Sequence, residues 1–148
     1  MDYLAVTLHC QAPMDVYTTP LGHKVIGCAI EVHRVLGPGL LESTYQSCTA
    51  DELTLNGLAF QQQVALPILY KGRAVGISYR IDFLVEGELL VELKTVERFL
   101  PIHDAQVLTY LKHLRLRQGL LINFNVKRLV DGVRSILNSS VAGPELRT

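Results

Sequence analysis

Residues Tyr79–Val96 read YRIDFLVEGELLVELKTV, and the expected fold is built outward from them. Two apolar runs, Ile77–Val85 and Leu89–Val96, flank a short break centred on Gly87. Apolar runs separated by a glycine-centred loop of this length are typical of two antiparallel strands joined as a hairpin. We therefore expect a hairpin with its turn at this glycine.

This hairpin would bring charged side chains together. With the turn centred on the glycine, Asp82 lies opposite Glu92, and Arg80 lies opposite Lys94. Cβ atoms of opposed residues lie about 4.5–5.5 Å apart, and like charges in that position are destabilising. Because side chains alternate along a strand, Lys94 lies on the same face as Glu92. The apolar residues between these positions point to the other face, and they are Ile81, Phe83, Val91 and Leu93.

Two opposed carboxylates need a compensating cation. Lys94 supplies part of it, and a divalent metal held by Asp82 and Glu92 would supply the rest, because hard cations take carboxylate oxygens. The alternative is that these are solvated positions on the wet face of a sheet, where Lys94 and Arg80 balance the acids. The charge pattern by itself leaves both interpretations open.

Three motifs resemble those of a known nuclease superfamily. Asp82 followed by Glu92-Leu93-Lys94 resembles the D…(D/E)-x-K signature of the PD-(D/E)XK nuclease superfamily. Downstream, Gln106-Val107-Leu108-Thr109-Tyr110 is similar to the Q-x-x-x-Y element of the branch typified by the RecB nuclease domain. Upstream, GLLESTY at 39–45 matches the G-x-x-E-x-x-Y string of the GxxExxY proteins, a small bacterial family assigned to the same superfamily. The likeness to that family runs roughly from Leu21 to Val133.

The resemblance implies a metal-dependent nuclease acting on nucleic acid, with DNA as the first expectation. It implies that Asp82 and Glu92 hold Mg²⁺ or Mn²⁺, with the backbone carbonyl of Leu93 and the carboxylate of Glu42 completing the shell. The ion would act as a Lewis acid and activate a water. Lys94 would orient or deprotonate that water and stabilise the charge that develops on the phosphate.

The resemblance also gives roles to residues on two helices. Gln106 would hydrogen-bond a catalytic water or a phosphate, and Tyr110, four residues on and on the same helix face, would support it. The alternative is an ordinary polar flank. Glu42 falls in the first turn of its helix, where a carboxylate is favourable without any function. Tyr45 would pack beside the site or hydrogen-bond it, and we expect both Tyr45 and Gly39 to be structural.

Composition bounds the class of protein. The chain has 148 residues, 49% of them hydrophobic and 7% aromatic, which suits one domain with an aliphatic core. The formal net charge is zero, which argues against a protein that coats nucleic acid through bulk electrostatics. Between Ala105 and Val130, however, all five charged residues are basic: Lys112, Arg115, Arg117, Lys127 and Arg128. A local basic surface is therefore expected.

Cysteine usage and hydropathy suggest a protein of the cytoplasm. Cys10, Cys28 and Cys48 form no C-x-x-C pair, and we expect reduced, mostly buried thiols. No apolar run approaches the roughly 20 residues of a membrane span, and no secretory signal is recognisable. Residues 1–18 show no clear period and are interpreted as a tail, with Met14 as a hypothetical true start.

The remaining elements follow from periodicity and from turn residues. Thr19-Pro20 is typical of a helix start, and Asn56-Gly57 is typical of a helix end. The expected elements are helices at 21–36, 40–55 and 102–114, strands at 60–70, 77–85, 89–96 and 119–126, and a short helix or strand at 130–137. On the third helix we expect four residues to face inward: Ala105, Leu108, Leu111 and Leu114.

The order of these elements predicts the fold. It is an α/β domain over residues 19–137 with a restriction-endonuclease-like ααβββαβ core, a mixed central sheet flanked by helices, and a polar tail over 138–148. The buried run at 119–126 would join the sheet beside the hairpin. Pro67 suggests an edge position or an irregularity in the first strand.

Two other classes of function remain open. One is a nucleic-acid-binding or regulatory module that keeps the fold but has little or no activity. The neutral charge and the short connections, which leave no obvious DNA-gripping insertion, favour it. The other is an assembly protein that acts as a homo-oligomer through an exposed apolar edge.

Overall fold

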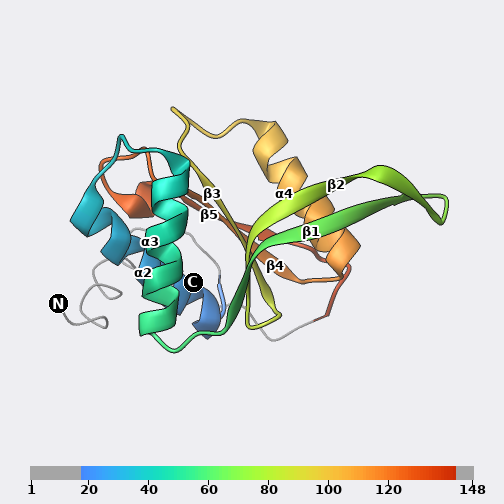
Figure 1. The fold of residues 1–148 in the computed structure, drawn as a ribbon, viewed down its shortest axis with the longest axis horizontal. Helices are drawn as coiled ribbons and strands as arrows, with labels where there is room; N and C mark the ends of the chain where they lie inside the picture. The colour runs from blue at the N-terminus through green and yellow to red at the C-terminus, as the bar shows by residue number, and fades with distance from the viewer. Residues whose placement is uncertain (1–17, 143–148) are drawn as a thin grey trace.

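The computed structural model of the chain describes residues 18–142 (Figure 1). Its elements are α2 (Pro20–Leu36), α3 (Glu42–Leu55), β1 (Phe60–Tyr70), β2 (Arg73–Val85), β3 (Leu89–Lys94), α4 (Pro101–Leu114), β4 (Gln118–Asn123), the 3-10 helix η1 (Leu129–Gly132) and β5 (Val133–Leu137). The last expected element is thus a 3-10 turn followed by a strand. The expected N-terminal tail up to Tyr17, with Cys10 and Met14, lies outside the described residues, as does the C-terminal tail beyond Ala142.

The strands form one mixed sheet in the order β1-β2-β3-β4-β5. β3 and β4 are parallel, and the other neighbouring strands are antiparallel. Parallel strands need a crossover connection, and α4 supplies it. Every residue of β4 is buried, as expected for a strand covered on both faces. The predicted α/β fold with an ααβββαβ core is confirmed.

Helices cover both faces of the sheet and create two hydrophobic clusters. On β3, Leu89, Val91 and Leu93 pack in the cluster that includes α2 and α3 residues. Leu90, between them, packs with residues of α4. Figure 1 shows α2 and α3 together on one side of the sheet and α4 on the other. Side chains that alternate along β3 therefore pack against different helices on the two faces of the sheet.

Local signals placed most helix ends correctly. The Thr19 side chain accepts a hydrogen bond from the Gly22 amide at 3.2 Å and caps α2. The inward face predicted for α4 was partly wrong, because Ala105 is exposed and the buried residues are Val107, Tyr110 and Leu111. The helix is rotated so that its aromatic residue, rather than its alanine, contacts the sheet.

The predicted register of the hairpin is confirmed over three pairs, which are Phe83–Val91, Leu84–Leu90 and Val85–Leu89. Beyond them the two strands separate. Arg80 pairs with Ala65 of β1 and Lys94 pairs with Asn123 of β4, so the predicted Arg80–Lys94 pair does not form.

The separation also changes the side to which one residue points. Ile81 was expected to share a face with Phe83, but it packs in the cluster of α4 with Leu66. Phe83 packs in the cluster of α2 and α3. The alternation of side chains along β2 is therefore interrupted between these two residues, at Asp82.

β1 and β2 continue past the rest of the sheet as a two-stranded ribbon (Figure 1). A register shift between Pro67 and Leu69 interrupts their ladder, at the proline that suggested an irregularity. Lys71 and Gly72 close the ribbon with positive φ at both residues, as in the type I′ turns preferred by hairpins. Among the described residues, no helix has the length and apolar character that crossing a membrane requires.

Candidate active site

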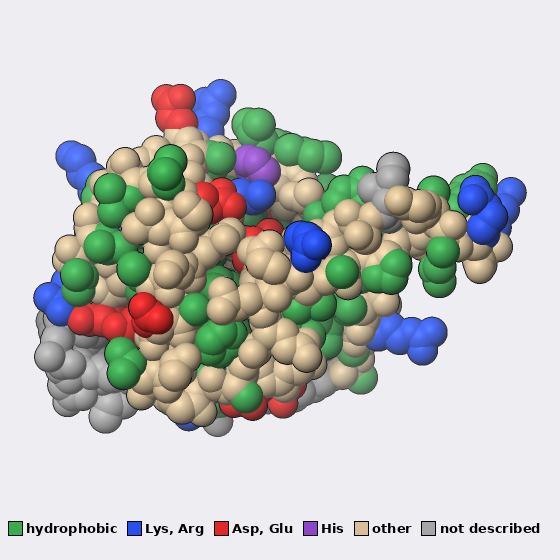
Figure 2. All heavy atoms as spheres, viewed as in Figure 1, with side chains coloured by type: hydrophobic (Ala, Val, Ile, Leu, Met, Phe, Trp, Pro, Cys, Tyr) green, Lys and Arg blue, Asp and Glu red, His purple; other side chains and the backbone are tan. Residues whose placement is uncertain are grey.

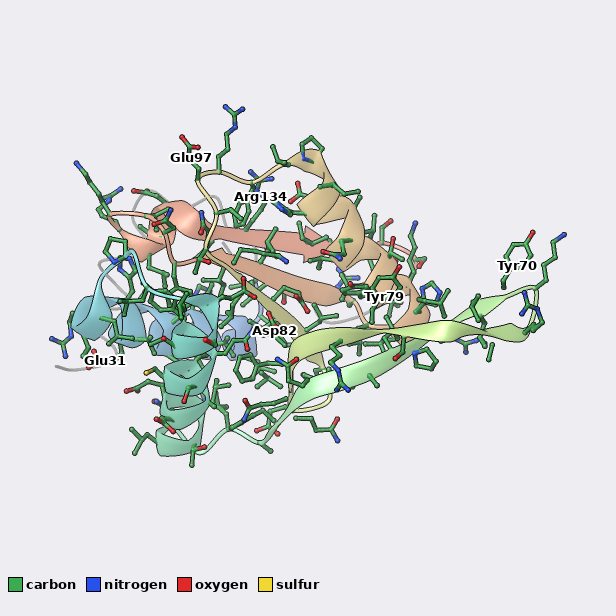
Figure 3. All side chains as sticks on the ribbon, turned by 45° about the horizontal axis from the view of Figure 1, so that its top comes forward. Glu31, Tyr70, Tyr79, Asp82, Glu97 and Arg134 are labelled. Atoms are coloured by element: carbon green, nitrogen blue, oxygen red, sulfur yellow. The ribbon has the colours of Figure 1, made fainter. Side chains whose placement is uncertain are left out.

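Asp82 and Glu92 lie where β2 and β3 separate, and their carboxylates replace the backbone hydrogen bonds of the ladder. The Asp82 amide donates to Glu92 Oε1 at 3.0 Å, and the Leu93 amide donates to Asp82 Oδ2 at 2.8 Å. Asp82 is 7% exposed and Glu92 is 5% exposed. The two acids are therefore held together inside the sheet rather than on a solvated face. Figure 3 shows Asp82 between α3 and the base of the ribbon.

Burial and mutual repulsion perturb both acids. Burial, followed by the charge of Asp82, raises the pKa of Glu92 to about 8. Burial also raises the pKa of Asp82, against the lowering effects of the Leu93 amide and of Lys94. Burial disfavours the charged form of an acid, and a second carboxylate adds to that effect. At neutral pH the pair therefore retains a proton that a divalent cation would displace.

Lys94 is half-buried, two residues beyond Glu92 on β3. Its charge lowers the pKa of Asp82, Glu92 and Glu42 alike, although burial prevails in each case. One ammonium group is thus within electrostatic reach of three carboxylates. In Figure 2 acidic and basic side chains meet in a hollow near the middle of the visible face.

Glu42 reaches the edge of this group from the first turn of α3. Burial, followed by the charge of Asp82, raises its pKa. The two carboxylates are bridged by Gln46, whose Nε2 lies 2.9 Å from Asp82 Oδ1 and 3.4 Å from Glu42 Oε1. An amide donor therefore lies where an ion shared by these two acids would have to bind.

Two glutamines of the site were not singled out from the sequence. Gln46 follows Glu42 by one helical turn, and that spacing was a signal that could have found it. Gln63 lies on β1 and donates to Gln46 Oε1 at 3.3 Å and to Asp82 Oδ1 at 3.5 Å. Its φ is +51°, which is uncommon for a residue other than glycine, and no local pattern indicates it. Strained backbone of this kind is found more often at functional sites than elsewhere.

A groove of about 600 Å³ opens on the α4 side of the sheet, with Lys94 in its wall. Gln106 and Tyr110 line the groove from α4, one helical turn apart, and Gln106 acts to lower the pKa of Tyr110 against the larger effect of burial. The charge of Glu92 contributes, after burial, to a raised pKa of Tyr110, so this phenol lies near the acids. The groove continues to Tyr79 of β2, whose ring centroid lies 6.0 Å from that of Tyr110.

A second hollow of about 580 Å³ lies on the other side of Asp82. It is lined by Glu42 and Gln46 of α3 and by Gln63 of β1. Asp82 contributes to its wall, whereas Lys94 contributes to the wall of the α4 groove. The charged residues thus lie between two open spaces, each large enough for part of a polymeric substrate.

Tyr45 does not face these acids. Its ring is fully buried and stacks on Phe124 with a centroid separation of 4.4 Å. Its hydroxyl donates to the Gly37 carbonyl at 2.6 Å and accepts from the Leu40 amide at 3.2 Å. Tyr45 therefore ties the loop before α3 to the core and holds the first turn of α3, with Glu42, in place.

The donor atoms fit a hard divalent cation. Asp82 and Glu92 offer oxygen ligands only, and Mg²⁺ is usually held by one or two carboxylates with waters completing its shell. Among residues 18–142 no group of three or more histidine, cysteine, aspartate or glutamate side chains is arranged to hold a metal. Glu42 is accordingly separated from the buried pair by the Gln46 amide and is not placed as a direct third ligand.

Comparisons with known proteins address the family and the fold. The family model of the PD-(D/E)XK nuclease superfamily matches residues 19–136. No curated protein matches the chain. Of solved structures, the chain is similar to "Crystal structure of SSO0001", with a TM-score of 0.52 and 18% identity over 92% of this chain and 76% of that one. At this identity the structural likeness concerns the fold alone.

Proposed function

Because the chain belongs to the PD-(D/E)XK nuclease superfamily, we propose that it is a metal-dependent nuclease that hydrolyses phosphodiester bonds, with DNA as the substrate to test first. Within the superfamily we assign it to the GxxExxY proteins and the RecB-like branch, on its GLLESTY and Gln106–Tyr110 motifs. The observation that carries the proposal is the buried pair of Asp82 and Glu92 with Lys94 within electrostatic reach.

Asp82 and Glu92 would hold Mg²⁺ or Mn²⁺, with the Leu93 carbonyl as a further ligand and Glu42 acting through water. When bound, such an ion supplies Lewis-acid polarisation of the phosphate and lowers the pKa of an attacking water. The hydrogen bonds from the Asp82 and Leu93 amides hold both carboxylates in place. Buried oxygens with fixed orientation need little rearrangement to bind a cation.

Lys94 would orient the attacking water and stabilise negative charge that develops on the phosphate oxygens, because a compact ammonium in a half-buried position is poorly screened. Gln106 would hydrogen-bond a phosphate oxygen or the water from the opposite wall of the groove. Tyr110 would hold the Gln106 side chain in that orientation. Tyr45 would act indirectly, by fixing the turn that carries Glu42.

A cleavage assay tests the proposal. End-labelled single-stranded DNA, duplex DNA and RNA are incubated with wild type in Mg²⁺ or Mn²⁺. Asp82→Asn should reduce the cleavage rate by at least about 100-fold, since it removes charge at the ion. Asp131→Asn is the matched control, because Asp131 is exposed in η1 and its ion pair within residues 18–142 is with Arg128, far from the acids in the sequence. Equal rates for wild type and Asp82→Asn would rule out the proposed site.

One observation favours the second candidate, a binding module without activity. The Gln46 and Gln63 amides already donate to Asp82 Oδ1, so this carboxylate is satisfied without a cation. Such a module would bind nucleic acid with no cleavage in either metal, and Lys94→Ala would bind as well as wild type. Light scattering with and without DNA would detect the homo-oligomer that a pure assembly role requires.

A further inference from the structure

The ribbon formed by residues 67–80, which we call the arm, projects from the body of the molecule (Figure 1). Within the described sheet its residues pair only along the β1–β2 ladder, because β3 pairs with β2 no further along than Phe83. From Arg73 to Asp82 the strand advances roughly 30 Å, at about 3.3 Å per residue. The connection at its tip is the short Lys71-Gly72 turn, as expected, and the strands themselves form an extension beside the acids.

The arm exposes apolar and aromatic side chains that the body of the protein does not cover. Leu69 is 59% exposed, Tyr70 is 58% exposed and Tyr79 is 45% exposed. A two-stranded hairpin alone is at best marginally stable in water. The free part of the arm therefore contributes little to folding, and its length is better explained by what it contacts.

The charge of the arm indicates the chemistry of that contact. From Phe60 to Ile81 the chain has no acidic residue, and its three charged residues are Lys71, Arg73 and Arg80. None of the three forms an ion pair with a carboxylate within residues 18–142. Figure 2 shows basic side chains at the tip of the projecting ribbon, with no acidic side chain beside them on that face. An exposed, purely cationic element complements a polyanion.

The base of the arm leads to the candidate active site. Ile68 and Tyr79 form the arm side of the 600 Å³ groove, whose other walls include α4 residues and Lys94. Arg80 donates to the carbonyl of Gln63, which in turn contacts Asp82, so a cation also lies at the junction. A polymer that follows the arm towards the body would reach the groove and its lysine.

We propose that the arm binds the phosphate backbone of the nucleic acid substrate and guides one strand into the groove beside Lys94. This rests on the proposed function. Lys71 and Arg73 contact phosphates, which provides affinity without reading sequence. Tyr79 offers a ring on which an unpaired base stacks. The Tyr70 ring has Lys71 Nζ 5.4 Å from its centroid and so holds that cation at the tip of the arm. The shared chemistry is the phosphodiester backbone, which single strands and duplexes both present.

Binding is measured by fluorescence anisotropy in EDTA, with a labelled single strand and a labelled duplex of equal length. The arm variant is Lys71→Gln/Arg73→Gln. The matched control is Lys24→Gln/Arg98→Gln, which removes the same charge from exposed residues outside the arm and outside the basic stretch at 105–130. We expect the arm variant to bind roughly tenfold more weakly. The slope of log K against log salt concentration should fall in magnitude by about 1.4 for the single strand or about 1.8 for the duplex, because two phosphate contacts are lost.

The salt slope distinguishes the loss of phosphate contacts from a change in folding. The exchange Lys71→Arg/Arg73→Lys keeps both charges and should therefore show the affinity and the slope of wild type. Equal losses in the arm variant and the control would overturn the proposal. So would wild-type binding by the arm variant. Light scattering gives the mass of each variant, and a mass that depends on the arm residues would make the arm a contact between copies of the chain, which also overturns it.

The outcome is distinguishable from that of the proposed function. Arm-dependent binding in EDTA by a wild-type protein that never cleaves with Mg²⁺ or Mn²⁺ would leave the arm assignment standing and refute the nuclease. Cleavage that requires Asp82 but proceeds with the same KM in the arm variant would support the nuclease and refute the arm assignment. A correct arm assignment raises KM in the arm variant and leaves kcat close to that of wild type.

Discussion

Replacing Glu92 with glutamine should make the metal-free protein more stable at high pH. In the wild type, burial and the charge of Asp82 raise the pKa of Glu92 from its ordinary 4.5 to about 8. Each pKa unit corresponds to about 1.4 kcal/mol, so the whole effect is roughly 5 kcal/mol. Glutamine keeps an Oε1 acceptor for the Asp82 amide and offers an N–H donor to the carboxylate of Asp82. The substitution therefore removes the repulsion and retains the hydrogen bond.

The sign follows from proton linkage. The folded state binds the Glu92 proton more tightly than the unfolded state, since its folded pKa is the higher of the two. This contribution to the free energy of unfolding is therefore fully present below about pH 4.5 and is lost as the pH rises through about 8. Between pH 5.5 and pH 9 the loss amounts to about 3 kcal/mol.

The assay is urea unfolding in EDTA at pH 5.5 and at pH 9, for wild type and Glu92→Gln. The difference in unfolding free energy between the two proteins should shift by about 3 kcal/mol in favour of the variant as the pH rises. Glu88→Gln is the matched control, because Glu88 is exposed in the adjacent turn. Its difference from wild type should stay within about 0.5 kcal/mol.

Parallel pH profiles for wild type and Glu92→Gln would refute the reasoning, because they would show that the two carboxylates do not repel each other in the folded protein. A second series of measurements adds Mg²⁺ at pH 9. An ion bound to the pair stabilises the folded state by about 2.7 kcal/mol at a concentration 100 times its Kd. Wild type should gain this stability, and Glu92→Gln should gain far less of it.

Three further substitutions test the surroundings of the site. Tyr45→Phe should cost about 1–3 kcal/mol of unfolding free energy in urea, because it leaves the Gly37 carbonyl without its 2.6 Å donor. Gly119→Ala should destabilise by about 1–3 kcal/mol in the same assay, since the added Cβ would lie 2.8 Å from Val107 Cγ1 and push α4 from β4. Gln63→Gly should leave stability unchanged or raise it by up to about 1 kcal/mol, because glycine relieves the positive φ. Isothermal titration should show Mg²⁺ binding at least as tight as in wild type, because the variant lacks an amide donor that satisfies Asp82 Oδ1 without a cation.

Much of the architecture follows from local patterns. The apolar runs around Gly87 identified the hairpin and its register, which holds over three residue pairs. Thr19-Pro20 and Asn56-Gly57 marked helix ends because capping depends on residues near in sequence. The continuous apolar run of β4 indicated a strand covered on both faces, as it is. These signals depend on residues close in sequence, and the elements they predicted are present in the fold.

The site was predictable only as a set of residue types. That Asp82, Glu92 and Lys94 belong together could be inferred from spacing and resemblance. Their actual arrangement, with the carboxylates accepting backbone hydrogen bonds inside an opening of the sheet, could not. It arises because β2 pairs with β1 along its first part while β3 pairs with β4, so the pairing of strands distant in sequence decides where β2 and β3 separate.

The amino-acid sequence alone thus determined the order of elements, the helix limits and the hairpin turn, because periodicity and turn chemistry act over a few residues. The acids were identified by the resemblance of their spacing to a family motif. The tertiary structure alone decided that Gln46 bridges two carboxylates, that Gln63 adopts a positive φ opposite Asp82, and that Ile81 turns towards α4. Each of these depends on which surfaces of distant segments are buried against one another. Burial and strand pairing are properties of the whole chain, and no short stretch of it encodes them.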